Sequence, residues 1–235
     1  MQFIFDNLIA TMVVMALTVT LLGQQARSRQ ESVERTSVYA AKTQALGFAE
    51  WLEDDVVKLG ARFGRSRDRF KATTETREGA PFTTAFDFYY NDETVADNVV
   101  NRVEVRYELA PDPGTRVVVA KGDTPADDEL LTVYRLTRSQ RSGHYNTATD
   151  AWVTTGGAAP AWTVSAEYQS PPGLRHFHIE PRDSDGNPVD DGRPEDADYA
   201  RVEFTVVPTL FPLHRARLVP KKGLHWATTI EIRPF

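Results

Sequence analysis

The first 22 residues constrain this chain more than any other segment, because they contain a single charged side chain, that of Asp6. Residues 8–22 consist only of Leu, Ile, Val, Met, Ala and Thr. As an α-helix, the first 22 residues are about 33 Å long, which matches the ~30 Å hydrocarbon core of a bilayer. This composition is typical of a helix that spans a membrane once or packs in the core of a filament.

Two other interpretations of this segment are a cleaved secretory signal and a buried helix of a soluble domain. A secretory signal opens with Lys or Arg, whereas the residues before this apolar run include an acid and no basic residue. We therefore favour the spanning or filament-core helix. Asp6 then lies either at the headgroup level, where the helix macrodipole favours an anion, or beside the N-terminal ammonium group of a neighbouring copy.

Residues 23–64 are expected to continue the helix in amphipathic form, with an end near residue 63. Their apolar residues recur at intervals of three or four, which is the spacing of one helix face. These residues are Val38, Ala41, Ala45, Phe48, Leu52, Val56 and Leu59. Such a helix is roughly 90 Å long, so only its second half can pack on its own domain. We expect the last four residues of that face to pack on the sheet that follows.

The remainder of the chain predicts an antiparallel sheet. All fourteen prolines lie at or after residue 81, which suggests a linker over residues 65–80 and a β-rich domain over residues 81–235. Short alternating stretches rich in β-branched and aromatic residues recur there between turn residues. The expected strands cover residues 83–90, 101–109, 116–121, 130–137, 162–168, 175–179, 201–207 and 226–233. The predicted fold class is α+β, with the long N-terminal helix packed on a C-terminal antiparallel sheet.

Composition and motifs argue against several function classes. The chain contains no cysteine, which excludes disulfides, thiol catalysis and Cys-ligated metals. Its formal net charge of −6 repels phosphate backbones, so nucleic acid is not an expected partner. The sequence also contains no nucleophile elbow, phosphate-binding loop, dinucleotide fingerprint or zinc-protease motif. We therefore expect no enzymatic activity and no cofactor.

Two stretches contain residue types that bind metals. The first is an acidic turn with oxygen side chains at alternate positions around a glycine, as in hard-cation loops. Its candidate calcium ligands are Asp183, Asp185, Asn187 and Asp191. The alternative interpretation is a solvated acidic turn, because Asp-Gly and Asn-Pro are common turn dipeptides. The second stretch contains His176 and His178, which alternate on an expected strand and so point the same way. A metal site there needs a third ligand from elsewhere in the chain, and the alternative interpretation is a pair of surface histidines.

The N-terminal architecture resembles that of type IV pilins and of minor pseudopilins of type II secretion systems. If the mature chain begins at Gln2, Asp6 stands fifth, where such pilins usually have Glu. Residues 51–60, WLEDDVVKLG, are similar to a helix end of the form Leu-x-x-Asp-Leu-x-x-x-Gly found among minor members. The resemblance covers about residues 2–63. It implies a structural subunit that waits in the inner membrane and is then assembled into an extracellular or periplasmic filament.

By the same resemblance, Asp6 offsets the N-terminal amine of a neighbouring subunit and the apolar run forms the filament core. The residues expected to act in assembly are Phe3, Phe5, Asp6, Leu8, Val13, Leu17 and Leu21. The implied partners are copies of the chain or related pilin-like subunits, and membrane lipid before assembly.

The alternative function is a single-pass accessory subunit of a larger membrane complex. Arg27, Arg29 and Arg35 follow the apolar run, and no Lys or Arg precedes it. The positive-inside rule therefore places the C-terminal domain in the cytoplasm, which is the opposite of a pilin.

Overall fold

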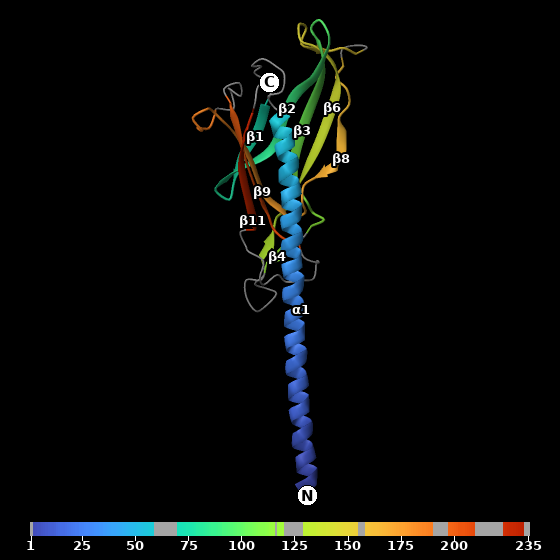
Figure 1. Ribbon diagram of the computed structural model, residues 1–235, viewed down its shortest axis with the longest axis vertical. Helices are drawn as coiled ribbons and strands as arrows, with labels where there is room; N and C mark the ends of the chain where they lie inside the picture. The colour runs from blue at the N-terminus through green and yellow to red at the C-terminus, as the bar shows by residue number, and fades with distance from the viewer. Residues whose placement is uncertain are drawn as a thin grey trace.

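The computed structural model describes residues 2–58, 70–115, 117–119, 129–154, 158–189, 197–209 and 223–232. Within them, one long helix leads into an antiparallel sheet, which confirms the predicted α+β class (Figure 1). The helix is α1 (Gln2–Val57), and the first strands are β1 (Phe70–Arg77), β2 (Ala80–Ala96), β3 (Val99–Pro111), β4 (Val117–Val119) and β5 (Glu129–Leu131). The remaining strands are β6 (Tyr134–Asn146), β7 (Ala151–Trp152), β8 (Thr163–Gln169), β9 (Leu174–Arg182), β10 (Tyr199–Val206) and β11 (Leu224–Glu231).

The main sheet has nine strands, and every pairing in it is antiparallel. Its central order is β1-β2-β3-β6-β9-β10-β11, and β7 and β8 pair with β6. β4 and β5 form a separate two-stranded sheet. The β1–β2 hairpin turns through Glu78 and Gly79, whose φ angles are 50° and 80°. Glycine adopts this left-handed conformation at no steric cost, which allows the tight turn.

The sheet buries one face against the second half of the helix. Along β2, Phe86 and Phe88 are buried while Asp87 and Tyr89, which alternate with them, are half-buried, as expected of a strand with one covered face. The principal core cluster joins Ala41, Ala45, Phe48, Ala49, Leu52 and Val56 of α1 to residues of β2, β3, β6, β9, β10 and β11. The second half of the helix therefore forms part of the domain core.

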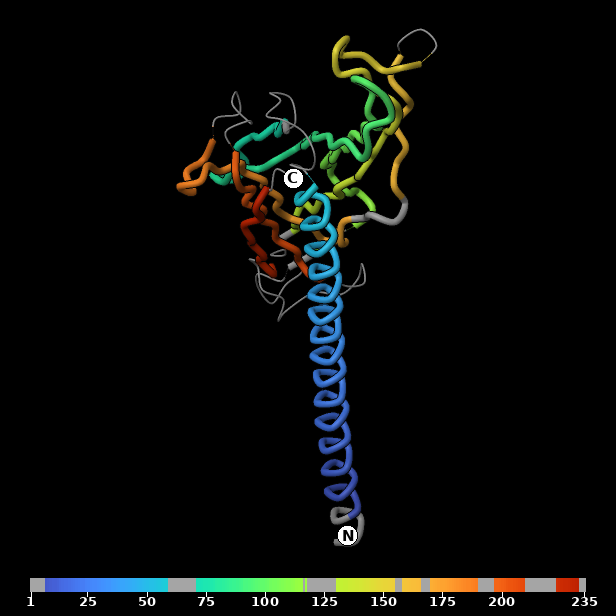
Figure 2. Tube along the Cα trace, turned by 45° about the horizontal axis from the view of Figure 1, so that its top comes forward, coloured from blue at the N-terminus to red at the C-terminus, as the bar shows by residue number. Residues whose placement is uncertain are grey.

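The molecule is elongated because most of the first half of α1 extends beyond the sheet. In Figure 1 the N-terminal part of the helix continues away from the strands toward the N-terminus, and Figure 2 shows the same projection from another angle. Only the C-terminal part of α1 runs alongside the strands in both views. This division confirms the prediction that only the second half of the helix packs on its own domain.

Two predicted boundaries differ from the structure, and a third, the end of the helix, is not tested by it. The structure describes α-helix to Val57 and a 3₁₀ conformation at Lys58, and the predicted end near residue 63 lies outside the described residues. The linker predicted over residues 65–80 is wrong for residues 70–77, which form β1. That strand has no apolar alternation beyond Phe70 and Ala72, so its pairing with β2 comes from backbone hydrogen bonds that the side-chain pattern does not reveal.

The stretch 130–137 was predicted as one strand but divides between two sheets. β5 ends at Leu131 and pairs with β4, whereas β6 begins at Tyr134 and pairs with β3. Thr132 and Val133 connect them in irregular conformation. The apolar pattern continues through the break because Val133 is buried in a small separate core with Val117 and Leu131. The other predicted strands correspond to β2, β3, β4, β8, β9, β10 and β11 with shifted ends.

Candidate functional site

The first half of the helix presents an uncovered apolar surface. We call residues 7–33 the free segment, because all of them are exposed except the half-buried Gln30. The large apolar side chains from residue 8 to residue 22 are 52–69% exposed. They are Leu8, Ile9, Met12, Val13, Val14, Met15, Leu17, Val19, Leu21 and Leu22. This part of α1 is long and apolar enough to cross a membrane, and none of it is buried in the fold.

The threonines of the free segment do not interrupt its apolar character. The hydroxyl groups of Thr11, Thr18 and Thr20 each donate a hydrogen bond to the carbonyl oxygen four residues earlier, at 2.8 Å. A hydroxyl satisfied in this way exposes its methyl group and needs no outside partner. The surface therefore suits either hydrocarbon or the apolar face of another helix.

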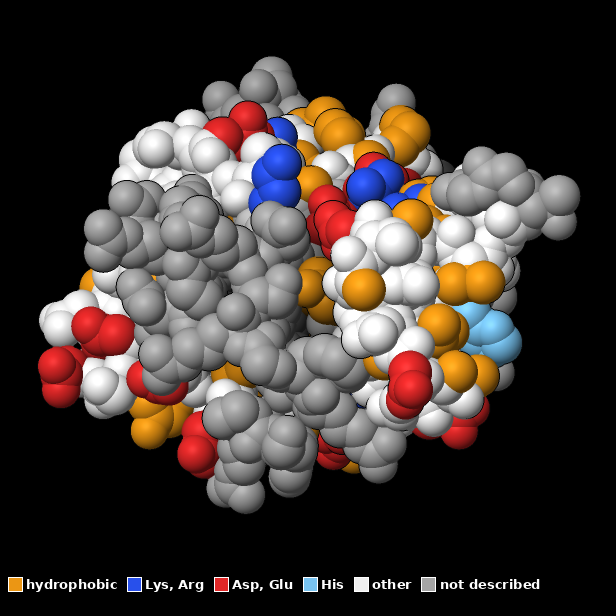
Figure 3. Space-filling view, turned by 90° about the horizontal axis from the view of Figure 1, so that it is seen from above, with side chains coloured by type: hydrophobic (Ala, Val, Ile, Leu, Met, Phe, Trp, Pro, Cys, Tyr) orange, Lys and Arg blue, Asp and Glu red, His pale blue; other side chains and the backbone are white. Residues whose placement is uncertain are grey.

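Of the predicted assembly residues, Leu8, Val13, Leu17 and Leu21 lie exposed on the free segment. Phe3, Phe5 and Asp6 lie in the first turns of α1, and their side chains are outside the described residues. The apolar patch is a property of the helix and not of the domain end. In the end-on view of Figure 3, the described part of the opposite end shows scattered acidic, basic and apolar side chains.

The second half of the helix is buried along one face. We call residues 34–57 the docked segment. Phe48, Leu52 and Val56 are 4%, 0% and 0% exposed, which confirms three of the predicted packing residues; Leu59 lies outside the described residues. Phe48 packs edge-on against Phe204 of β10 with ring centroids 5.0 Å apart. Such aromatic contacts add about 0.5–1.5 kcal/mol to area burial.

A buried polar network holds the C-terminal end of the docked segment on the sheet. The Asp55 carboxylate accepts hydrogen bonds from Arg138 Nε of β6 at 2.6 Å and from the hydroxyl of Tyr107 of β3. Asp55 and Arg138 are each 3% exposed and Tyr107 is fully buried. Lys58 Nζ adds a contact of 3.2 Å from the half-exposed side. Burial, and then the neighbouring carboxylate, raise the pKa of Tyr107 well above its usual value, so this hydroxyl remains a donor.

Glu34 and Ser37 lie at the other end of the docked segment. Glu34 is 1% exposed and accepts a hydrogen bond of 3.3 Å from Gln30 Nε2. The Ser37 hydroxyl donates to the backbone carbonyl of Thr209 at 2.9 Å. Polar contacts, fully buried at Asp55 and partly buried here, thus occur at both ends of the docked segment.

The sequence interpretation missed Glu34, Asp55 and their partners. Both acids fall on the apolar face defined by Val38, Leu52 and Val56, and a charge at such a position was the available signal. Arg138 and Tyr107 carried no comparable signal, because only the folded sheet brings residues from two separate strands beneath Asp55.

The predicted calcium ligands form a hydrogen-bonded turn after β9. Asp183 Oδ1 accepts from the backbone amides of Asp185 and Asn187 at 3.0 and 2.8 Å, and these bonds, led by that from Asn187, lower the pKa of Asp183. Within the described residues no three potential ligands cluster to hold a metal ion. Asp191 lies outside them. The carboxylate of Asp183 therefore serves the turn in this structure.

His176 and His178 lie on β9 as predicted, but they are not simple surface residues. His178 is 7% exposed, and its Nδ1 lies 3.3 Å from the Thr83 hydroxyl of β2. His176 Nε2 lies 3.6 Å from a carboxylate oxygen of Glu203 on β10. Burial lowers the pKa of both imidazoles, against the opposing effect of Glu203. Their surroundings are those of neutral side chains within the sheet.

The geometry therefore identifies the free segment, together with the docked segment that holds the helix on the sheet, as the candidate functional region. Comparison with known proteins adds no family to this description. No family model, no curated protein and no solved structure matches the chain.

Proposed function

We propose that this chain is a pilin-like or pseudopilin-like structural subunit, anchored in a membrane by its N-terminal helix before it joins a helical filament through the same helix. The observation that carries this proposal is the division of α1 into a free segment and a docked segment. The free segment is uncovered and is apolar from residue 8 to residue 22, and it is continuous with a segment that a buried ion pair fixes to the domain.

The free segment needs an apolar environment. Leaving a large aliphatic side chain in water costs about 1.5–3 kcal/mol relative to burying it, and ten such side chains are exposed between residues 8 and 22. Lipid tails and the helices of neighbouring subunits both cover such a surface. Because lipid is as apolar as leucine, transfer from membrane to filament keeps this burial and depends on helix packing and polar pairing.

Asp6 supplies the polar pairing in this proposal. A carboxylate in an apolar layer costs on the order of 2.5–3.5 kcal/mol near the bilayer centre and less toward the interface. Pairing with the N-terminal ammonium group of an adjacent subunit neutralises both charges, and it requires a particular axial offset between the two helices. The pairing therefore sets the register of the assembly more than its strength.

The proposed partners are copies of this chain or related subunits, with membrane lipid before assembly and no nucleic acid. The proposed location is a single pass in the inner membrane, followed by an extracellular or periplasmic filament. The role is structural and not catalytic. The β-rich domain then forms the outer surface of the filament.

The test is the Asp6→Ala variant, expressed as the full chain in its own cells. We expect an unchanged amount of the variant in the membrane fraction and a strong loss of the chain from sheared filaments viewed by electron microscopy. Asn7→Ala, one residue further, is the matched control and is expected to assemble normally. Normal filament yield from Asp6→Ala contradicts the pairing, and absence of the unmodified chain from any filament contradicts the whole proposal.

The second candidate is a single-pass accessory subunit of a membrane complex. It is favoured by one observation, the three arginines that follow the apolar run on the exposed side of α1 while no basic residue precedes it. This arrangement places the β-rich domain in the cytoplasm. Protease added to intact cells, or to spheroplasts, distinguishes the two: digestion of the domain supports the filament subunit, and protection supports the accessory subunit.

A further inference from the structure

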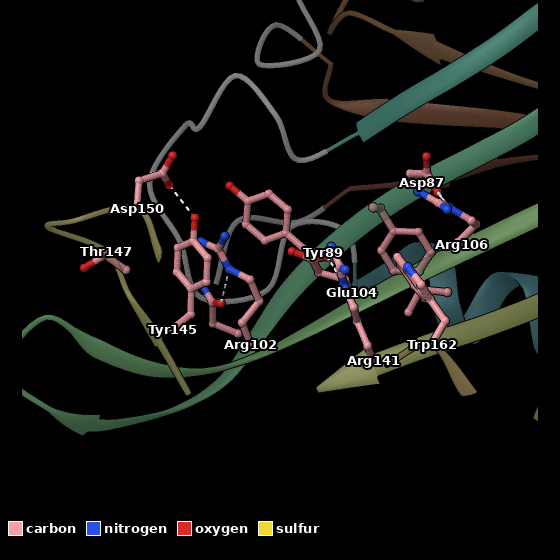
Figure 4. Close-up of a pocket in the computed structure, with 13 residues that line it drawn as sticks. Asp87, Tyr89, Arg102, Glu104, Arg106, Arg141, Tyr145, Thr147, Asp150 and Trp162 are labelled. Carbon is pink, nitrogen blue, oxygen red and sulfur yellow. Dashed lines mark hydrogen bonds and ion pairs between the residues drawn. The ribbon is translucent and has the colours of Figure 1, made fainter. Parts of the chain in front are cut away.

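The face of the sheet that points away from the helix contains a cavity. Its volume is about 420 Å³, and residues of β2, β3 and β6 line it together with Trp162 and the turn after β6 (Figure 4). The lining combines arginines, carboxylates and aromatic rings. These side chains alternate along their strands with the core residues that face α1, so the cavity is separated from the helix by the sheet.

Two of the three arginines in the cavity have carboxylate partners. Arg106 Nε donates to Asp87 at 2.7 Å, and Arg141 Nε donates to Glu104 at 2.6 Å. Both guanidinium groups also lie about 4.5 Å from the ring of Trp162, at 4.6 and 4.5 Å from its centroid. In Figure 4 these residues form one end of the cavity. Their charges are balanced within the protein.

Arg102 differs from these two, because the side chains that contact it directly, Tyr89, Tyr145 and Asn91, are uncharged. Its guanidinium carbon lies 4.1 Å from the ring centroid of Tyr89 and 3.3 Å from that of Tyr145, between the two rings (Figure 4). Arg102 is 8% exposed. Among the described residues, no carboxylate oxygen lies within 4.0 Å of its nitrogens. A buried guanidinium is normally paired with an anion, since removing its charge from water is costly.

Asn91 adds an unused donor beside Arg102. It is 1% exposed, and its Oδ1 accepts a hydrogen bond of 3.4 Å from Arg102 Nε. This contact places the amide nitrogen on the other branch of the side chain. Within the described part of the chain, Asn91 Nδ2 has no hydrogen-bond partner. Native proteins rarely leave such a buried donor unused, so it points to an acceptor that is supplied from outside.

We propose that this cavity binds a sugar acid, with the ligand carboxylate held by Arg102 and Asn91 and the sugar ring set against the aromatic side chains. The Arg102 guanidinium and Asn91 Nδ2 are both hydrogen-bond donors, and a carboxylate accepts hydrogen bonds from both. The bond from Arg102 is charge-assisted. Asp87, Glu104 and Asp150 line the same cavity and accept hydrogen bonds from hydroxyl groups. The cavity has the size of ordinary small-ligand sites, about 300–1,000 Å³.

The lining favours this ligand over two other anions. A phosphate carries a charge of about −1.5 to −2, which exceeds the single positive charge of Arg102 that is left once Arg106 and Arg141 are paired with Asp87 and Glu104. An acidic peptide carries no sugar hydroxyls for those carboxylates. Peptides also commonly bind by adding a strand to a sheet edge, whereas this cavity lies on a sheet face.

The test is isothermal titration calorimetry of the full chain in nonionic detergent, with glucuronate as the probe. We expect saturable binding of glucuronate and none of glucose, which has the same ring without the carboxylate. Glucose 6-phosphate and glutamate serve as the phosphate and amino-acid comparisons. Absence of glucuronate binding, equal binding of glucose, or tighter binding of either comparison ligand overturns the proposal.

Two variants locate the site. Arg102→Gln is expected to weaken glucuronate binding about tenfold or more, as for loss of a hydrogen bond to a charged group. Asn91→Asp has nearly the same shape but gives Arg102 a carboxylate of its own, so it is expected to abolish binding while the thermal midpoint is kept or raised. Arg135→Gln, an exposed arginine outside the cavity, is the matched control. A folded Asn91→Asp protein that still binds glucuronate overturns the proposal.

Discussion

The free segment and the docked segment belong to one helix, yet they have opposite surroundings. Leu17 in the free segment is 59% exposed, whereas Leu52 in the docked segment is fully buried. Leucine has the same helix propensity at both positions, so local preference does not separate them. The comparison teaches that a continuous helix can contain two different interfaces, one completed within the chain and one left open.

The two segments also differ in whether their apolar face contains charged side chains. The docked segment places Asp55 in a buried network with Arg138 and Tyr107. From residue 8 to residue 22 the free segment carries no charge at all. A sheet supplies fixed hydrogen-bond donors for a buried carboxylate, whereas hydrocarbon supplies none. This explains why Asp55 is tolerated in the docked segment while residues 8–22 carry no charge.

The largest expected effect is a loss of unfolding free energy in Asp55→Ala, because this change removes the buried contact between the docked segment and the sheet. Removing the carboxylate leaves Arg138 buried without its ion-pair partner, and breaking such a pair costs about 3–5 kcal/mol in the free energy of unfolding. The measurement is chemical denaturation of the full chain in nonionic detergent. Asp54→Ala is the control, because Asp54 is exposed one residue away and its loss is expected to change stability by less than about 0.5 kcal/mol. Equal effects of the two variants contradict the role of the network.

The next largest effect is expected from Leu52→Ala. Truncating a fully buried leucine removes its transfer free energy and leaves a cavity, which together cost about 3 kcal/mol in the free energy of unfolding. The same denaturation experiment measures it. Leu46→Ala is the matched control on the same helix, since Leu46 is 48% exposed. A loss below about 1 kcal/mol for Leu52→Ala contradicts tight packing of the helix on the sheet.

Leu17→Arg tests the free segment. It is expected to weaken membrane association without changing the free energy of unfolding of the domain. A charge in the middle of the apolar run makes insertion about 3 kcal/mol less favourable, so extraction by alkaline carbonate should release more of the chain from membranes. The unfolding free energy of the domain should not change, because Leu17 is exposed. Leu17→Met keeps the apolar character and is the control. Unaltered membrane retention of Leu17→Arg contradicts a membrane role for this segment.

The smallest expected effect is a pH dependence of the unfolding free energy that arises from His178 in the sheet. Burial lowers the pKa of His178 below its usual value of 6.5, despite the opposing carboxylates of Glu203 and Glu180. The unfolded chain therefore binds the proton more readily, so stability is lost as the pH falls below 6.5 toward the lower folded pKa. Denaturation midpoints between neutral and mildly acidic pH measure this. His178→Asn is expected to weaken the dependence without removing it, because burial lowers the pKa of His176 in the same direction, and a stability that rises on acidification contradicts the neutral buried state.

Much of this architecture was predictable because it follows from repeated local patterns. The apolar run and the three-four spacing through Phe48, Leu52 and Val56 predicted one helix with a free and a packed half. Period-two alternation located most strands. β1 was missed because its sequence, FKATTETR, has little apolar alternation, and an edge strand is stabilised by pairing that such a pattern does not record.

The chain sequence by itself determined the long helix, the uncovered apolar surface and the antiparallel class of the sheet, because each depends on the periodicity of neighbouring residues. Only the tertiary structure decided which charged residues are buried and what they contact. Asp55 meets Arg138 across 83 positions of sequence, and Arg102 meets Asn91 across the β2–β3 hairpin. These contacts depend on strand order and register, which no local pattern encodes, and they define both the seating of the helix and the cavity on the opposite face.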